Sequence, residues 1–176
     1  IKHNNKLMQI KEFQHVKPGK GPAFVRTKMR GIEDGRVLDH TFPSGHKIDI
    51  VRIENRSYQY LYKENDGYHF MNTSNYEQVF IESHMIDQPD FLKEGIICTI
   101  IFHAEEEMPL LVEQPQFLST EVTYTEPGIK GDTATNTMKP ATIETGAKVK
   151  VPLFINKGDL IKVDIQKGMY VERIKS

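Results

Sequence analysis

The sequence predicts an all-β protein built of three small β-barrels. Short runs rich in β-branched and aromatic residues recur along all 176 residues, separated by Gly, Pro, Asn and Asp turns. No helical period of 3.6 lasts beyond two turns. Charge is also segmented: residues 1–51 hold 10 Lys and Arg against 5 Asp and Glu, residues 52–114 hold 4 against 12, and residues 115–176 hold 9 against 7. We take these segments as the three domains.

The first segment contains strand-like runs divided by tight turns. After an initial strand-like start come LMQIKEFQHV, AFVRTKMRGI, RVLDHTF and HKIDIVRI, and the turns between them are HNNK, KPGKGP, EDG and PSG. Five short strands in about 50 residues favour a small closed barrel.

The other two segments repeat this pattern. The middle segment gives SYQYLYK, YHFMNTSNYEQVFI, GIICTIIFH and PLLVEQ, with Glu105, Glu106 and Glu107 in a solvated hairpin turn. The last gives FLSTEVTYTE, ATIETG, AKVKVPLFI, LIKVDIQ and MYVERI. One short helix is expected in IDQPDFLKEG, where Asp87 suits the cap, Pro89 the first turn and Gly95 the position after the end.

The residues offer no catalytic or metal site. Seven histidines show no HxH or HExxH spacing, and there is no C-x-x-C pair, so no metal is expected. PGKGPAF lacks the spacing of a phosphate loop, and no G-x-S-x-G elbow exists. The lone Cys98 lies in an apolar strand and is expected in the core, which suits a reducing compartment. No run is long enough to span a bilayer and no signal peptide is visible. We therefore expect a protein that is not an enzyme.

A basic hairpin remains as the candidate interface. Lys20 stands at the tip of the KPGKGP turn, and alternation in AFVRTKMR places Arg26, Lys28 and Arg30 on one face of a strand. With Lys17, these cations form a stripe suited to a phosphate backbone. From charge alone, a solvated strand face is an equally good interpretation.

Several longer motifs resemble the bacterial elongation factor P family. They run collinearly through the chain: EFQHVKPGKGPAFVRTK, GRVLDHTF, YQYLYK, YHFMNT, PGIKGDTA, KPATIETGAKVKVPLFI, GDLIKVD and YVERIK. The resemblance implies an SH3/KOW-like first domain and two OB-like barrels, in an L-shaped arrangement like that of tRNA. Members normally carry some dozen residues before the position of Ile1, so we expect the first strand to be incomplete and the first domain N-terminally truncated.

The resemblance also implies a function. Family members bind the ribosome between the peptidyl and exit sites and relieve stalling at consecutive prolines, as non-enzymatic factors. The implied partners are the ribosome, peptidyl-tRNA, ribosomal RNA and a lysine-modifying enzyme, with mRNA as a further candidate. The implied protein is a cytoplasmic monomer, without a cofactor and without membrane contact.

Family roles carry over to particular residues of this sequence. Lys20 matches the tip lysine that approaches the CCA end of peptidyl-tRNA and is covalently extended in many members. The matching positions are Pro18, Gly19 and Gly21 in the loop that presents it, Gly131, Asp132 and Thr133 in the loop near the exit-site codon and small subunit, and Tyr170 and Arg173 in the C-terminal motif.

One alternative function is a general binder of single-stranded nucleic acid made of OB-like barrels. Such proteins stack bases on exposed aromatic side chains. This chain has no Trp, and its aromatic residues alternate with polar ones in the manner of core positions. We therefore favour the translation factor.

Overall fold

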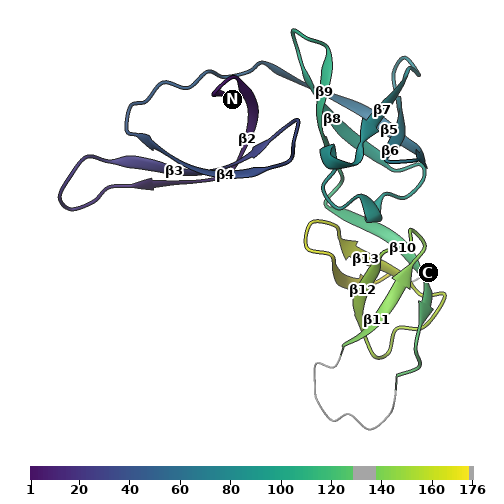
Figure 1. The fold of residues 1–176 in the computed structure, drawn as a ribbon. Coiled ribbons are helices and arrows are strands. Elements are labelled where there is room, and N and C mark those ends of the chain that lie inside the picture. Colours follow the sequence, from purple (N-terminus) through teal and green to yellow (C-terminus); the bar gives the residue numbers. More distant parts are fainter. Residues whose placement is uncertain (129–137, 175–176) are drawn as a thin grey trace.

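The structure is a computed structural model that describes residues 1–128 and 138–174, and it confirms the all-β prediction. The strands form three antiparallel sheets that follow one another along the chain. Figure 1 shows the first sheet as one arm and the second and third sheets as the other arm, so the predicted L-shaped arrangement is confirmed. No helix within the described ranges is long and apolar enough to cross a membrane.

The first sheet is a curled half-barrel with the strand order β1-β2-β3-β4. Its strands are β1 (Lys2–His3), β2 (Lys6–Val16), β3 (Phe24–Gly31) and β4 (Val37–Pro43). Met8, Met29 and Phe42 form its small buried core. The prediction of a fifth strand over HKIDIVRI is wrong. Within it, Asp49 makes an isolated bridge to Lys2 and Ile53 already begins β5 of the second sheet, because this segment crosses from one sheet to the next.

The second sheet has the order β7-β6-β5-β8-β9 and the largest aromatic core. Its strands are β5 (Ile53–Glu64), β6 (Gly67–Asn72), β7 (Gln78–Glu82), β8 (Ile97–His103) and β9 (Met108–Glu113). Phe70 is fully buried at its centre. Cys98 is buried beside it, which confirms the core prediction, and this burial raises the pKa of its thiol to about 12. The residues 105–107 form an exposed turn, as predicted.

The third sheet has the order β12-β11-β10-β13-β14. Its strands are β10 (Phe117–Thr125), β11 (Met138–Ile143), β12 (Lys148–Pro152), β13 (Leu160–Asp164) and β14 (Met169–Arg173). Small β-branched side chains fill its core, among them Val122, Val151 and Ile161, none of which is exposed. This pattern follows from the period-2 alternation of each strand.

The predicted helix is only a single 3₁₀ turn, η2 (Pro89–Phe91). A similar turn, η1 (Ser83–Met85), precedes it. Gln88 rather than Asp87 occupies the N-cap of η2, and no side chain caps it. The expectation for Asp87 was wrong because its carboxylate instead pairs with Lys11 and Arg30 of the first domain. Gly95 follows the turn at φ 83°, a conformation that favours glycine.

Two junctions hold the three domains in series. At the first junction, Leu7 and Ile32 of the first domain pack against an apolar cluster on β8 and β9 of the second, next to the Asp87 ion pairs. At the second junction, Phe91 inserts into the core of the third domain, and the Lys93 ammonium lies 2.7 Å from the Glu144 carboxylate. Each junction therefore combines apolar burial with an ion pair.

A histidine cluster surrounds Phe42 on the concave face of the first sheet, and it predicts a pH dependence. The rings of His3, His40 and His46 lie 4.5–5.5 Å from that of Phe42, centroid to centroid. Desolvation, and then repulsion from His40 and His46, lower the pKa of His3 below its ordinary value of 6.5. The unfolded chain therefore takes up this proton first. The contribution of neutral His3 to first-domain stability is fully present above pH 6.5 and is lost as pH falls from 6.5 through the lowered pKa.

We expect His3→Gln to weaken this pH dependence. The measurement is the melting temperature of first-sheet amide NMR signals at about pH 5.5 and about pH 7.5. The wild type should lose stability at the lower pH, and His3→Gln should lose less of it. His15→Gln, an exposed site on β2, is the control. An equal loss in wild type and His3→Gln would show that His3 is not the group responsible.

Candidate nucleic-acid interface

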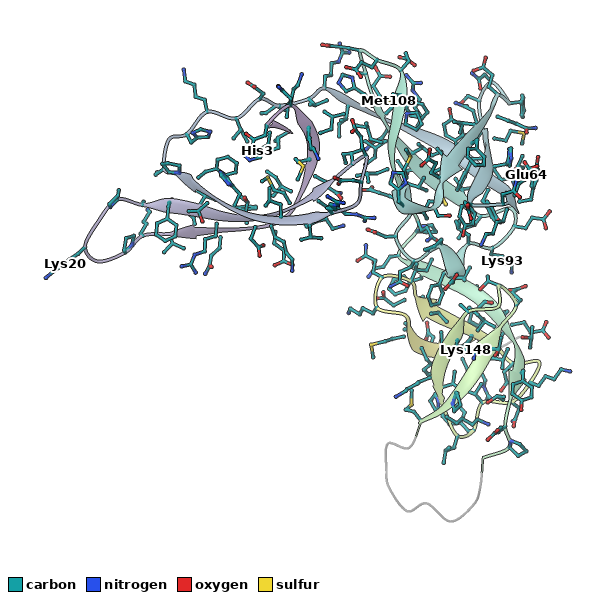
Figure 2. The ribbon with its side chains drawn as sticks, in the orientation of Figure 1. His3, Lys20, Glu64, Lys93, Met108 and Lys148 are labelled. Atoms are coloured by element: carbon teal, nitrogen blue, oxygen red, sulfur yellow. The ribbon has the colours of Figure 1, made fainter. Side chains whose placement is uncertain are left out.

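The candidate interface is the long β2–β3 hairpin, which carries Lys20 at its tip. The two strands pair in antiparallel register as far as Val16 and Phe24, so the hairpin is hydrogen-bonded up to the base of the loop. Beyond Val16 the chain leaves the sheet, and residues 17–22 are exposed. Figure 2 shows Lys20 at the end of the first arm, pointing away from the rest of the molecule.

The loop exposes the Lys20 side chain to solvent. Among residues 1–128 and 138–174, no salt bridge or side-chain hydrogen bond involves Lys20. Gly21 has a φ of 109°, which residues with a Cβ rarely adopt, so the turn after Lys20 requires glycine. A Cβ at Gly19 would meet nothing within 4 Å, so this glycine leaves open space beside the tip instead. The ammonium is therefore free to contact a partner.

The β3 cations lie on the predicted exposed face, but their neighbours differ. Thr27 and Met29 are buried while Arg26 and Lys28 are exposed, which confirms the alternation. Cross-strand register places Lys28 between Glu12 and Asp39, so two carboxylates flank its charge.

Arg26 has a less acidic neighbourhood. It lies between Gln14 and Thr41 in the same register, and its guanidinium is 5.5 Å from the centroid of the Phe24 ring. Since neutral neighbours leave its charge uncompensated, Arg26 is the stronger candidate on this face for contact with a phosphate.

Arg30 belongs to the domain junction rather than to the open face. Its side chain is 17% exposed, and its guanidinium donates hydrogen bonds to the Asp87 carboxylate and, at 2.7 Å, to the His84 carbonyl oxygen. Lys11 donates to the other oxygen of Asp87 at 3.1 Å. These two cations lower the pKa of Asp87 against the opposing effect of its burial. We therefore leave Arg30 out of the nucleic-acid interface.

Family models and named relatives identify the family. The family model described as Elongation factor P (EF-P) KOW-like domain matches residues 1–48, the Elongation factor P (EF-P) OB domain matches residues 53–111, and Elongation factor P, C-terminal matches residues 118–173. Elongation factor P of Flavobacterium psychrophilum is 54% identical over 175 residues, covering 99% of this chain and 94% of that protein. This chain belongs to the elongation factor P family.

Another relative agrees with this assignment. Elongation factor P of Azobacteroides pseudotrichonymphae is 59% identical over 166 residues, 94% of this chain and 89% of that protein. Among solved structures, eukaryotic translation initiation factor 5A from Methanococcus jannaschii is 20% identical and covers 64% of this chain and 80% of that one, with a TM-score of 0.44. The domain types of the elongation factor P family confirm the predicted KOW-like first domain and OB-like second domain.

Two of the remaining predicted residues of this elongation factor P family member, Tyr170 and Arg173, lie far from the hairpin. Tyr170 and Arg173 are on β14, in the other arm. Tyr170 packs against the core of the third domain, and burial raises the pKa of its hydroxyl. Arg173 is 46% exposed, 3.9 Å from Asp159. Gly131, Asp132 and Thr133 lie outside the described residues.

The sequence interpretation missed two features. Asp87 joins the first and second domains, and no local pattern marks that role because its partners are 76 and 57 residues away. The aromatic residues also do not all belong to cores: Phe13, Tyr62 and Phe80 are 75%, 50% and 49% exposed. The interpretation of aromatic alternation as core packing was wrong for these three.

Proposed function

We propose that this protein binds the ribosome between the peptidyl and exit sites and relieves stalling at consecutive prolines. Membership of the elongation factor P family supports a role in translation. The observation that supports the specific role is the exposed Lys20 ammonium at the end of a long hairpin arm, without a partner among the described residues. In this proposal the loop contacts the CCA end of peptidyl-tRNA, and Lys17 and Arg26 contact the RNA backbone.

The proposed mechanism is the positioning of peptidyl-tRNA. Proline fixes φ near −65° and is a secondary amine, so consecutive prolines restrict the geometry of both reacting groups. Holding two reactants in productive geometry is worth several kcal/mol of a barrier, up to roughly 7–11 in ideal intramolecular cases. The ribosome supplies the chemistry, and the factor supplies the position.

The exposed tip leaves room for a longer side chain at Lys20. We propose that a lysine-modifying enzyme extends this residue in the cell, since its side chain is exposed at the tip of an open loop. The modified protein would act as a cytoplasmic monomer. The mass of the peptide containing Lys20 from natively expressed protein tests this proposal, because an unmodified mass would contradict it.

A reconstituted translation reaction tests the function itself. The rate of synthesis of a peptide with three consecutive prolines is measured with and without the protein, alongside a matched peptide with three alanines. We expect acceleration of the proline peptide by at least about tenfold, equivalent to about 1.4 kcal/mol of the barrier, and little change for the alanine peptide. Equal effects on both peptides would contradict the proline-specific role.

A further inference from the structure

We propose that the outer face of the second sheet binds arginine side chains of a basic polypeptide. This face is formed by β5, β6 and β7 and belongs to a different domain from the Lys20 loop. In Figure 2 the labelled Glu64 lies on the side of the second domain away from the first arm. The proposal therefore concerns a second contact surface, independent of the proposed function.

Three aromatic side chains form a row across this face. Tyr62 pairs in register with His69, and His69 pairs with Phe80. The Tyr62 and His69 rings are stacked with centroids 4.6 Å apart, and His69 and Phe80 meet edge to face at 5.3 Å. Tyr62 and Phe80 are each about half exposed. We call Tyr62, His69 and Phe80 the aromatic row.

A β-bulge creates this row. Tyr60 pairs with Phe70 of the core, but the register shifts after it, so that Tyr62 pairs with His69 instead of Tyr68. Without this shift Tyr62 would share the inner face with Tyr60. A bulge that brings a large aromatic residue out of the core leaves apolar area in water, which is a cost that a binding surface explains.

A row of carboxylates lies beside the aromatic row. Glu64 pairs in register with Gly67, and Gly67 pairs with Glu82. A Cβ at Gly67 would lie 2.1 Å from the Phe80 Cζ atom, so the Phe80 ring lies across the strand at the glycine. The ring therefore reaches the space between two carboxylates, whose side chains are 59% and 63% exposed. We call Glu64 and Glu82 the acidic pair.

The acidic pair retains free acceptor capacity. Glu64 accepts a hydrogen bond from His69 at 2.8 Å, and Glu82 lies 3.2 Å from His84, each through one oxygen. An ionised carboxylate has about four lone-pair sites, so both can accept further donors. The nearest basic strand residue, Lys63, pairs with Tyr68 in register and so lies on the opposite face.

This combination fits a guanidinium group. A planar guanidinium stacks flat on an aromatic ring and at the same time donates two parallel hydrogen bonds to a carboxylate. An ammonium is a compact point charge that can approach a ring or a carboxylate but has no planar group to stack and no fork of donors. The segment 52–114 holds 12 Asp and Glu against 4 Lys and Arg, which attracts a basic polypeptide and repels nucleic acid. We therefore choose an arginine-bearing polypeptide over a stacked nucleobase.

Fluorescence anisotropy of a labelled peptide tests this site. The probe is a fluorescein-labelled peptide of alternating glycine and arginine, titrated with the full chain at low salt. We expect both double variants, Tyr62→Ala/Phe80→Ala and Glu64→Gln/Glu82→Gln, to weaken binding by about tenfold. Glu105→Gln/Glu106→Gln makes the same charge change on an exposed turn of the same domain and should leave binding nearly unchanged.

Three outcomes would overturn the proposal. The first is unchanged affinity in the aromatic double variant, and the second is equal affinity for the corresponding lysine peptide. The third is tighter binding of a single-stranded oligouridylate that the same variant abolishes. If either double variant fails to fold, NMR of the wild type decides, because the arginine peptide should shift the ring signals of the aromatic row. Shifts confined to other residues would also overturn it.

Discussion

Replacing Lys20 with alanine should remove most of the stimulation of consecutive-proline synthesis and leave the fold unchanged. The ammonium has no partner among the described residues, and its loop is exposed, so its loss breaks no internal contact. If Lys20 contacts the reacting end of peptidyl-tRNA, its removal costs interaction energy where positioning matters most. We expect at least about a tenfold loss of rate enhancement in the reconstituted reaction.

The matched control for this variant is Lys47→Ala. Lys47 is an exposed lysine of the same domain, outside the hairpin, so the substitution makes the same change of charge and size. It should retain full stimulation, and the two variants should have the same melting temperature as the wild type. Full stimulation by Lys20→Ala would contradict the role that we propose for the loop tip.

The second large effect concerns the core of the second domain. Phe70 is fully buried among aromatic residues, and Phe→Ala at such a site costs about 3–5 kcal/mol. A barrel of this size buries only about 60% of its unfolded surface and has little stability to spare. We therefore expect Phe70→Ala to unfold the second domain, or nearly so, at room temperature.

Phe80→Ala provides an internal comparison. Phe80 lies on the neighbouring strand but is 49% exposed, so the same substitution should cost less than about 1 kcal/mol. Urea unfolding followed by tyrosine fluorescence measures both, because five of the seven tyrosines lie in residues 52–114 and the chain has no Trp. Equal urea midpoints for the two variants would contradict the assignment of Phe70 to the core.

Local patterns in the sequence were sufficient to predict most strands and the exposed hairpin. The alternation in β3 correctly separated Arg26 and Lys28 from Thr27 and Met29, because side-chain direction in a strand depends only on period. The turn chemistry likewise placed Lys20 at an exposed tip. These features depend on residues that are neighbours in the chain.

Features that depend on distant residues could not be predicted in this way. The SYQYLYK run suggests three tyrosines on one face, but a bulge against β6 moves Tyr62 to the other. The sequence pattern placed Arg30 in the basic stripe, whereas in the structure Arg30 pairs with Asp87, 57 residues away. Similarly, the acidic neighbours of Lys28 come from two other strands. Register and domain contacts are tertiary properties that a single strand does not encode.

The first domain junction has a mechanical consequence for the Lys20 tip. Lys20 at the tip is nine residues beyond Lys11 at the junction, a span of up to about 30 Å at about 3.3 Å per residue, so the hairpin acts as a lever. A rotation of about 5° at the Asp87 junction would displace the tip by about 3 Å, which is as large as the distance between reacting atoms. The position of the Lys20 tip is therefore determined by the junction residues Lys11, Arg30 and Asp87 as much as by the loop itself.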